Sequence, residues 1–127
     1  MPFIRCPSPS EAIAAYERLR LAQDSALFLF FGSEDPATGV SWCPDCVLAD
    51  PVLRATIAAV APELTVYECP VGPRAAWKGV ETHPYRQHPA FRVQRIPTLV
   101  HFQHGLERGR LVEGACADAQ AIRAFLA

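Results

Sequence analysis

Several features that would assign the chain to a specialised class of protein are missing from its 127-residue sequence. The longest apolar run, Ala26 to Phe31, is far shorter than the roughly 20 residues that a membrane-spanning helix needs. The formal net charge is only −1, which argues against a general electrostatic attraction to nucleic acid or anionic membranes. No basic region followed by an apolar stretch opens the sequence, so we expect no secretory signal and a location in the reducing cytoplasm.

The cysteine content is also unsuited to a disulfide-rich scaffold, because five is an odd number. The cysteines are Cys6, Cys43, Cys46, Cys69 and Cys116, and only Cys43 and Cys46 lie close together in the sequence. In a cytosolic chain, where thiols are kept reduced, such a close pair is typically catalytic or metal-binding. Internal repeats and low-complexity tracts are absent, and half of the residues are apolar. We therefore expect one compact domain over residues 1–127.

The hydrophobic segments predict an α/β fold with a central mixed sheet flanked by helices. Residues 26–31 form a continuous apolar run, which is typical of a strand covered by helices on both faces. We expect strands at residues 3–6, 26–31, 64–69, 98–102 and 107–112, and helices at 8–24, 44–60 and 85–93 and from Cys116 or Asp118 onward. Because strands and helices alternate, the sheet lies between helices, and the final hairpin makes it mixed. In the 44–60 helix we expect Val47, Leu48, Val52 and Ala55 to face inward.

The segment that carries chemistry is Trp42-Cys43-Pro44-Asp45-Cys46, which lies between a buried strand and a helix. The spacing of the two cysteines allows their sulfurs to meet within one helical turn, close enough for a disulfide. Cys43 falls at the N-terminus of the helix, where free backbone N–H groups and the helix dipole favour an anion. This position lowers the pKa of Cys43, and the thiolate is the nucleophile in exchange reactions. Cys46 lies one turn further on, and we expect it to be more buried and to act as the resolving thiol.

A zinc site is the alternative interpretation of this pair, with further ligands from Cys69, His83 or His88. It is disfavoured because a structural site needs four ligands and the sequence holds no second close pair of cysteines. Asp45 also has two interpretations. It is a solvated acid of the first helical turn, which we favour, or it relays a proton and raises a thiol pKa.

The remaining candidates have simpler interpretations. Cys6 and Cys69 lie in expected strands and are interpreted as small buried apolar residues. Cys116 is either a helix-start residue, which we favour, or a second redox thiol. On the residues alone, Pro97 is interpreted as a proline that starts a strand.

These residues give the chain a resemblance to the thioredoxin family. It is most similar to the small cytosolic thioredoxin-related proteins with a WCPDC motif, the thioredoxin domain-containing protein seventeen type. The similarity covers nearly the whole chain. It rests on Gly32-Ser33, the stretch SWCPDCV at residues 41–47, Pro51-Val52 with Arg54, Val71-Gly72, Trp77-Lys78, Pro97-Thr98-Leu99, and Leu111-Val112-Glu113 with Cys116.

The resemblance implies a thioredoxin fold with a helical insertion at residues 71–84, after the third strand. It implies a dithiol mechanism with Cys43 as nucleophile and Cys46 as resolving thiol. Residues that the family places around the dithiol are Trp42, Pro44, Asp45, Ile96 and Pro97. Of these, Pro97 is expected to be a cis-proline, and the backbone of Ile96 is expected to pair with substrate.

The resemblance also implies no bound cofactor and no metal, with electrons coming from NADPH through thioredoxin reductase. Family substrates are cystine, other small disulfides, nitrosothiols, and selected protein disulfides or persulfides. The basic side chains of Arg74 and Lys78 would suit a carboxylate-bearing disulfide such as cystine. The chain departs from thioredoxins at Leu29, where they carry a buried acid, and in a longer loop before Trp42, and both features would narrow the substrate range.

The leading hypothesis is therefore a monomeric disulfide reductase that binds neither nucleic acid nor membrane. The main alternative is a redox-sensing binding adaptor with the same fold, which would not turn over a disulfide. A third hypothesis, an oxidant or isomerase, is disfavoured by the expected cytosolic location, and its redox potential would separate it from a reductase.

Overall fold

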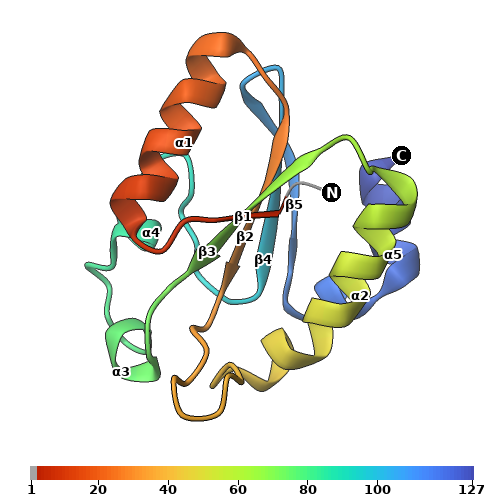
Figure 1. Ribbon diagram of the computed structural model, residues 1–127. Coiled ribbons are helices and arrows are strands. Elements are labelled where there is room, and N and C mark those ends of the chain that lie inside the picture. Colours follow the sequence, from red (N-terminus) through yellow and green to blue (C-terminus); the bar gives the residue numbers. More distant parts are fainter. Residues whose placement is uncertain (1–2) are drawn as a thin grey trace.

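The computed structural model describes residues 3–127 and arranges them in a mixed five-stranded sheet with helices on both faces (Figure 1). The strands are β1 (Phe3–Arg5), β2 (Ala26–Phe31), β3 (Thr65–Pro70), β4 (Thr98–Gln103) and β5 (Leu106–Val112). The helices are α1 (Pro9–Ala22), α2 (Pro44–Val60), α3 (Arg74–Trp77), α4 (Pro84–Gln87), the 3-10 helix η1 (Glu113–Ala117) and α5 (Ala119–Leu126). The mixed sheet and the helical insertion after the third strand are confirmed. Over residues 3–127, no helix combines the length and apolar character that a bilayer crossing requires.

The strand order brings the ends of β2 and β3 to the same edge of the sheet. The order is β1-β3-β2-β4-β5, in which β1, β3 and β2 are parallel. Strand β4 pairs antiparallel with β2, and β5 pairs antiparallel with β4. At the carboxyl end of β2 the chain turns into the segment that leads to α2. Open sheets of this kind bind their ligands at the carboxyl ends of such strands.

Strand β2 separates the two halves of the hydrophobic core. Successive side chains of a strand point to opposite faces. Phe28 and Phe30 enter the cluster that contains the buried residues of α1 and α4, whereas Leu27 and Leu29 enter the cluster formed with α2 and α5. In Figure 1, α1, α3 and α4 lie on one side of the sheet and α2 and α5 on the other. The expectation of a strand buried on both faces is confirmed.

Local capping explains where two of the helices begin. The Ser8 side chain accepts a hydrogen bond from the backbone N–H of Glu11, and Pro9 occupies the first turn of α1. The Asp118 carboxylate accepts hydrogen bonds from the N–H groups of Gln120 and Ala121 at the start of α5. Of the two expected starts for this last helix, Asp118 is therefore the right one.

The helix expected over residues 85–93 is wrong in its length. Helix α4 ends at Gln87, because His88 precedes Pro89 and the residue before a proline is disfavoured in the helical conformation. The chain then turns through Arg92, whose φ is 45°. This turn leads into the extended segment before β4.

The expected inward face of α2 is wrong at three of its four residues, because only Val52 packs against the core. Val47 is 42% exposed, Leu48 is 65% exposed and Ala55 is exposed as well, while Val52 is half-buried. The residues that face the sheet are Cys46, Ala49, Leu53, Thr56 and Ile57. These follow helical spacing from Cys46, and the small side chain at Ala49 lets the helix approach the sheet closely. Helix α2 is apolar on both sides, so the pattern alone did not fix which side is buried.

Candidate active site

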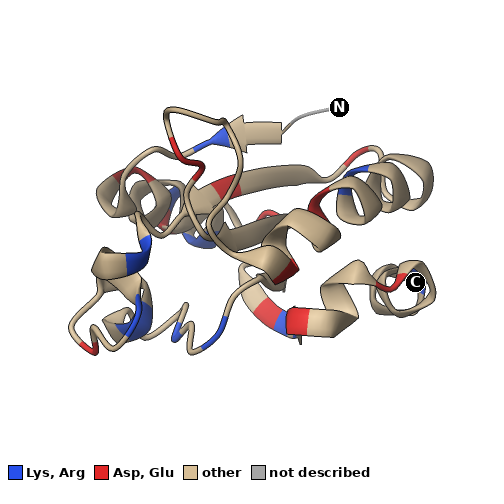
Figure 2. Ribbon diagram, turned by 90° about the horizontal axis from the view of Figure 1, so that it is seen from below, with Lys and Arg blue, Asp and Glu red and all other residues tan. Residues whose placement is uncertain are grey.

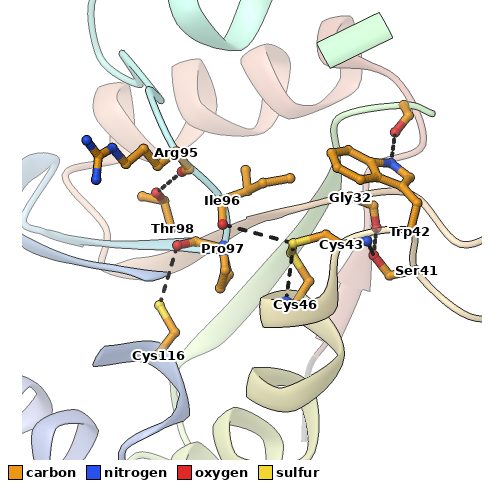
Figure 3. Close-up of a disulfide and its surroundings, with 11 residues drawn as sticks. Gly32, Ser41, Trp42, Cys43, Cys46, Arg95, Ile96, Pro97, Thr98 and Cys116 are labelled. Carbon is orange, nitrogen blue, oxygen red and sulfur yellow. Dashed lines mark hydrogen bonds between the residues drawn. A yellow bond between two sulfur atoms is a disulfide. The ribbon is translucent and has the colours of Figure 1, made fainter. Parts of the chain in front are cut away.

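Cys43 and Cys46 form a disulfide at the start of α2 (Figure 3). Their Cα atoms are 5.2 Å apart, which lies within the usual range for a disulfide. Cys43 is the N-cap residue of the helix, and its Sγ accepts a hydrogen bond from the backbone N–H of Cys46 at 3.2 Å. In the reduced protein this N–H group and the helix dipole would stabilise a thiolate on Cys43. The pair therefore lies where the sequence placed it.

Exposure does not distinguish the two cysteines, since each is 5% exposed. The expectation that Cys46 is more buried than Cys43 is therefore wrong. The two sulfurs differ instead in their surroundings. Cys43 lines an open cleft together with Ile96, and Cys46 lines a smaller groove together with Pro97.

Hydrogen bonds connect the end of the loop before the disulfide to Gly32, where this loop begins. The Ser41 hydroxyl donates to the Gly32 carbonyl at 2.6 Å and accepts from the Cys43 N–H at 3.2 Å. The Trp42 indole donates to the carbonyl of Gly72, at the beginning of the helical insertion. Gly32 itself allows a close approach, because a Cβ at this position would lie 2.8 Å from the Trp42 ring and 2.9 Å from the Cys43 Cβ. These contacts fix the position of the Cys43 backbone.

Pro97 lies beside the disulfide, and the Ile96–Pro97 peptide bond is cis, as the resemblance implied (Figure 3). The Ile96 carbonyl oxygen is 4.0 Å from the Cys43 Sγ. Behind the proline, the fully buried Cys116 thiol donates to the Pro97 carbonyl at 3.7 Å. Burial raises the pKa of Cys116 to about 12, which keeps it protonated and unreactive. Cys116 lies inside η1 and supports Pro97, so its interpretation as a residue that starts the last helix is wrong.

The cleft beside Cys43 has a volume of about 460 Å³ and a predominantly basic rim. Its charged lining residues are Arg74, Lys78, Arg86, Arg95, Asp45 and Glu113. Arg95 pairs with Glu113 at 3.0 Å, whereas Arg74 and Lys78 have no ion-pair partner within residues 3–127. Figure 2 shows the basic residues gathered along the insertion and the segment that follows it. Arg74 and Lys78 are thus exposed and available to an anionic ligand.

Arg86 has a structural role in the same cleft. Its guanidinium group stacks on Trp77, with 3.6 Å between the guanidinium carbon and the ring centroid. It also donates hydrogen bonds to the backbone carbonyls of Trp77 and Gln94. Arg86 therefore joins the insertion to the segment before Pro97, and the local sequence pattern gave no sign of this role.

The groove beside Cys46 is smaller and more apolar than the cleft beside Cys43. It has a volume of about 250 Å³ and lies between the loop over residues 32–41 and helix α2. Its apolar lining includes Leu29, Val40, Val47 and Pro97. The cleft beside Cys43 is therefore the wider of the two approaches to the disulfide.

A buried acid lies one strand away from the position where thioredoxins carry theirs. Leu29 on β2 is paired in register with Glu68 on β3, and Glu68 is only 6% exposed. The Glu68 carboxylate accepts hydrogen bonds from Arg5 at 3.3 Å and from Arg54. Arg54 also lines the groove beside Cys46. Because Glu68 is ionically paired on both sides, its charge is compensated within the fold.

The structure also places Asp45 and the histidines that were considered as zinc ligands. Asp45 is exposed in the first turn of α2, lines the Cys43 cleft and forms no ion pair within residues 3–127, which fits a solvated acid. The His83 ring is hydrogen-bonded to the Val71 carbonyl and to the Tyr85 N–H, and the His88 ring packs on Phe91. In the part of the chain that the structure describes, no three His, Cys, Asp or Glu side chains are grouped so as to hold a metal ion.

Comparisons with known proteins identify relatives of the whole arrangement. A family model described as thioredoxin domain-containing protein 17-like, thioredoxin domain, matches residues 10–127. The chain is 33% identical over 108 residues to the thioredoxin-like protein Clot of Arabidopsis thaliana, covering 82% of this chain and 80% of that protein. It is 32% identical over 96 residues to thioredoxin domain-containing protein 17 of Homo sapiens, covering 76% and 73%. The solved structure of oxidized thioredoxin O2 from Arabidopsis thaliana superposes with a TM-score of 0.68 over 97% of this chain and 90% of that one. Its sequence identity of 20% bears on the fold alone.

Proposed function

The chain belongs to the thioredoxin domain-containing protein 17-like family, and we propose that it is a disulfide reductase that works through Cys43 and Cys46. The fold and the cysteine pair establish a thiol-based redox function of the thiol-disulfide oxidoreductase type. One observation supports the more specific proposal. The Cys43 sulfur lies at a helix N-terminus, at an open cleft and 4.0 Å from the Ile96 carbonyl, where an incoming disulfide can be held.

Reduction of a substrate takes place in two exchanges. The Cys43 thiolate attacks one sulfur of the substrate disulfide, forms a mixed disulfide and releases the other substrate sulfur as a thiolate, which takes up a proton. Cys46 then loses its proton and attacks the Cys43 sulfur, which releases the second substrate thiol and leaves the Cys43–Cys46 disulfide. The backbone of Ile96 pairs with the substrate beside the cis-proline, and Trp42 and Pro44 shape the wall next to the reacting sulfur.

Small anionic disulfides such as cystine are the favoured substrates, together with selected protein disulfides. Arg74 and Lys78 lie in the cleft that holds Cys43, and the substrate carboxylates can approach them there. The loop over residues 32–41 and the insertion that carries α3 flank the disulfide, so they obstruct a broad protein surface more than a small molecule.

Recycling requires two electrons for each turnover, since the enzyme ends each cycle oxidised. These electrons come from NADPH through thioredoxin reductase, and the chain needs no bound cofactor for the exchange itself. The reducing cytoplasm is the compartment in which this direction of exchange is favoured.

A coupled assay tests the proposal. Purified protein is mixed with thioredoxin reductase and NADPH, and NADPH oxidation is followed with cystine or with insulin as the disulfide. We expect many turnovers per protein molecule with cystine and slower turnover with insulin. The variant Cys43→Ser with Cys46→Ser is the control and should give the rate seen without protein.

The redox-sensing adaptor remains the alternative function. The exposed apolar side chains of Val40, Val47 and Leu48 near the groove favour it, because they could contact a partner protein. An adaptor would change its oxidation state once and then stop. A single burst of NADPH oxidation without further turnover would therefore exclude the reductase and favour the adaptor.

A further inference from the structure

A second pair of cysteines lies side by side on neighbouring strands. Strand β1 runs parallel to β3 with Arg5 opposite Glu68, and the N–H of Cys6 donates to the Glu68 carbonyl at 2.9 Å. This bond belongs to the Arg5–Glu68 pair, so Cys6 and Cys69 are the residues that directly follow the last pair of the ladder on each strand. Side chains of residues paired on parallel strands point to the same face of the sheet. The sequence could not reveal this pair. The two cysteines have 62 residues between them, and neither strand by itself indicates which strand is its neighbour in the sheet.

The spacing of these two residues is suitable for a disulfide. Adjacent strands lie about 4.8 Å apart, and Cα atoms of bridged cysteines lie about 4.4–6.8 Å apart. Both thiols are free in this structure, and both belong to the same core cluster on the α1 side of the sheet. The Cβ atoms of bridged cysteines lie about 3.5–4.5 Å apart, so closing the bridge needs rotation of both side chains and a small approach of Cys6, which lies just beyond the end of β1.

The two thiols are chemically unequal. Hydrogen bonding from Cys69 lowers the pKa of Cys6, whereas burial raises the pKa of Cys69 well above its usual value. Cys6 is 4% exposed and is followed by the exposed Pro7, whereas Cys69 is fully buried. Cys6 is therefore the thiol that reacts first, and Cys69 is placed to resolve it.

A buried hydroxyl group adds a second, independent observation. The Tyr85 hydroxyl is fully buried and lies beside Cys69, which is the polar side chain placed to interact with it. Buried polar groups are nearly always satisfied, and no other group within residues 3–127 pairs with this hydroxyl. A hydroxyl in this position can donate to the Cys69 sulfur when that sulfur carries negative charge.

We infer that Cys6 and Cys69 form a second oxidisable dithiol, separate from the Cys43–Cys46 pair, which closes to a disulfide on reaction with hydrogen peroxide. The Cys6 thiolate attacks one peroxide oxygen and breaks the O–O bond. Cys6 becomes a sulfenic acid, and the hydroxide that leaves is protonated to water. The Cys69 sulfur then attacks the Cys6 sulfur, forms the S–S bond and displaces the oxygen as a second water. Two thiols are oxidised and one peroxide is reduced to two waters.

Peroxide is the matching oxidant because the pair is nearly closed to solvent. Cys43 is about as little exposed as Cys6, but it lines a cleft that can admit a substrate disulfide, whereas Cys6 and Cys69 line neither that cleft nor the groove beside Cys46. A bulky oxidant such as glutathione disulfide therefore has no cleft through which to approach this pair, whereas peroxide is hardly larger than water. This inference does not depend on the proposed reductase function, because neither active-site cysteine takes part in it.

The test uses the Cys43→Ser, Cys46→Ser variant, which keeps Cys6, Cys69 and Cys116. The variant is treated with hydrogen peroxide, alkylated after unfolding and digested with trypsin, which places the three thiols in peptides 6–18, 55–74 and 111–123. We expect peptides 6–18 and 55–74 to become disulfide-linked while Cys116 remains free for alkylation. Adding Cys116→Ser is the matched control and should leave the linked peptide unchanged.

Two further variants separate the steps. Cys69→Ser should leave Cys6 as a sulfenic acid, which a 1,3-diketone such as dimedone traps when it is present while the protein is unfolded, and Tyr85→Phe should slow closure several-fold and increase the trapped fraction. The wild-type protein keeps the test decisive if a variant fails to fold. If its Cys6 and Cys69 both remain free at a peroxide dose that fully oxidises Cys43 and Cys46, or if Cys6 is oxidised without any link to Cys69, the inference is wrong.

Discussion

The indole nitrogen of Trp42 donates a hydrogen bond to the carbonyl oxygen of Gly72 at 2.8 Å, across 30 positions of sequence. The same glycine accepts from the Ser33 N–H at 3.2 Å and donates to the Ser33 hydroxyl at 2.8 Å. The turn that carries the disulfide is thus tied to the first residues of the insertion that carries α3. Because that insertion also supplies the basic wall of the cleft, these contacts fix the position of the reactive sulfur relative to the charges that surround it.

Gly32→Ala tests how tightly this turn is packed. The added methyl group would lie 2.8 Å from the Trp42 ring and 2.9 Å from the Cys43 Cβ, so the ring and the Cys43 backbone must move. Overpacking of this kind costs about 1–3 kcal/mol, and displacement of Cys43 should lower kcat/KM for cystine. Urea unfolding and the coupled assay measure the two effects.

Gly114→Ala is the matched control for this substitution. A Cβ at Gly114 meets no atom within 4 Å and the residue has no positive φ, so stability and rate should stay near wild type. Equal behaviour of the two variants would show that the approach of Gly32 to Trp42 does not constrain the turn.

The sequence predicted correctly those helices and strands whose hydrophobic pattern fits a single structural interpretation. Residues 26–31 are apolar throughout, which indicates a strand covered on both faces, and in β2 the first five of them are buried. Helix α2 is apolar on more than one side, so its rotation was ambiguous, and Val47 and Leu48 proved to be exposed. Features that depend on long-range pairing were not predictable, because the contact of Trp42 with Gly72 requires the strand order.

The same limit applies to the candidate site. The reactive pair could be predicted from the spacing of the two cysteines and from their position at the start of a helix. In the structure, both cysteines lie at the start of α2 and are joined by a disulfide. The cleft combines side chains of α2, α3 and the segment before β4, and the sequence indicated Arg74 and Lys78 as charges facing a substrate there but gave no such role to Arg86 or Glu113. The relative burial of the two cysteines depends on packing against Ile96 and Pro97, and the local pattern did not contain that information.

Cys46→Ser should trap the first exchange. With the second thiol removed, a mixed disulfide between Cys43 and the substrate has no internal thiol to resolve it. Incubation with cystine should therefore yield a protein whose mass has increased by one cysteinyl group, while Cys43→Ser should yield none. Intact-protein mass spectrometry measures both. Full multiple-turnover activity in Cys46→Ser would exclude the two-step mechanism.

Asp45→Asn should lower the pKa of Cys43. Asp45 lines the same cleft as Cys43, and its negative charge opposes formation of the thiolate that the helix N-terminus favours. Because Asp45 is exposed, we expect a change below about one unit, which corresponds to roughly 1 kcal/mol. The rate of iodoacetamide alkylation against pH reports it.

Asp24→Asn is the control for this charge change, since Asp24 precedes β2 at the opposite end of the sheet and is also exposed. If the alkylation rate of Asp45→Asn depends on pH as that of Asp24→Asn does, or if its curve moves to higher pH, the charge of Asp45 does not raise the pKa of Cys43.

His83 should make the stability of the fold depend on pH. Its Nδ1 accepts the Tyr85 N–H at 3.0 Å, so its Nε2 carries the proton and donates to the Val71 carbonyl at 2.7 Å. Burial lowers the pKa of His83, so the folded protein binds fewer protons than the unfolded chain, whose histidine titrates near 6.5. The contribution of His83 is therefore fully present above about pH 6.5 and is lost as the pH falls below that value.

Urea unfolding at pH 7.5 and pH 5.5 measures this dependence. His83→Gln should lower the free energy of unfolding at pH 7.5 by about 1–3 kcal/mol, because a buried backbone N–H loses its acceptor. The variant should also lose less stability than wild type between the two pH values. His104→Asn is the control, because His104 is exposed in the turn between β4 and β5 and should leave the pH dependence unchanged. If His83→Gln keeps the full wild-type pH dependence, the effect comes from other groups.

Arg74→Glu combined with Lys78→Glu should raise the KM for cystine. Both side chains lie in the Cys43 cleft without an ion-pair partner in residues 3–127, and Arg86 and Arg95 are already engaged. Reversing the two charges turns an attraction for the substrate carboxylates into repulsion, while the Cys43–Cys46 chemistry is untouched, so kcat should change little. Exposed charges contribute only about 0–1 kcal/mol each and are screened by salt. We therefore expect a rise of several-fold in KM at low ionic strength that largely disappears in about 0.5 M salt.

The control must change the net charge equally without touching the cleft. Arg18→Glu with Arg123→Glu does so, because these exposed residues lie on α1 and α5, away from Cys43, and have no salt-bridge partner in the described chain. A neutral small disulfide assayed in parallel should show the same KM with all three proteins. If the control pair raises the KM for cystine as much as the cleft pair does, long-range charge and not the position of Arg74 and Lys78 governs substrate approach. If neither pair alters the KM at low salt, Arg74 and Lys78 are a solvated surface, and selection of small disulfides depends on the shape of the two flanking loops alone.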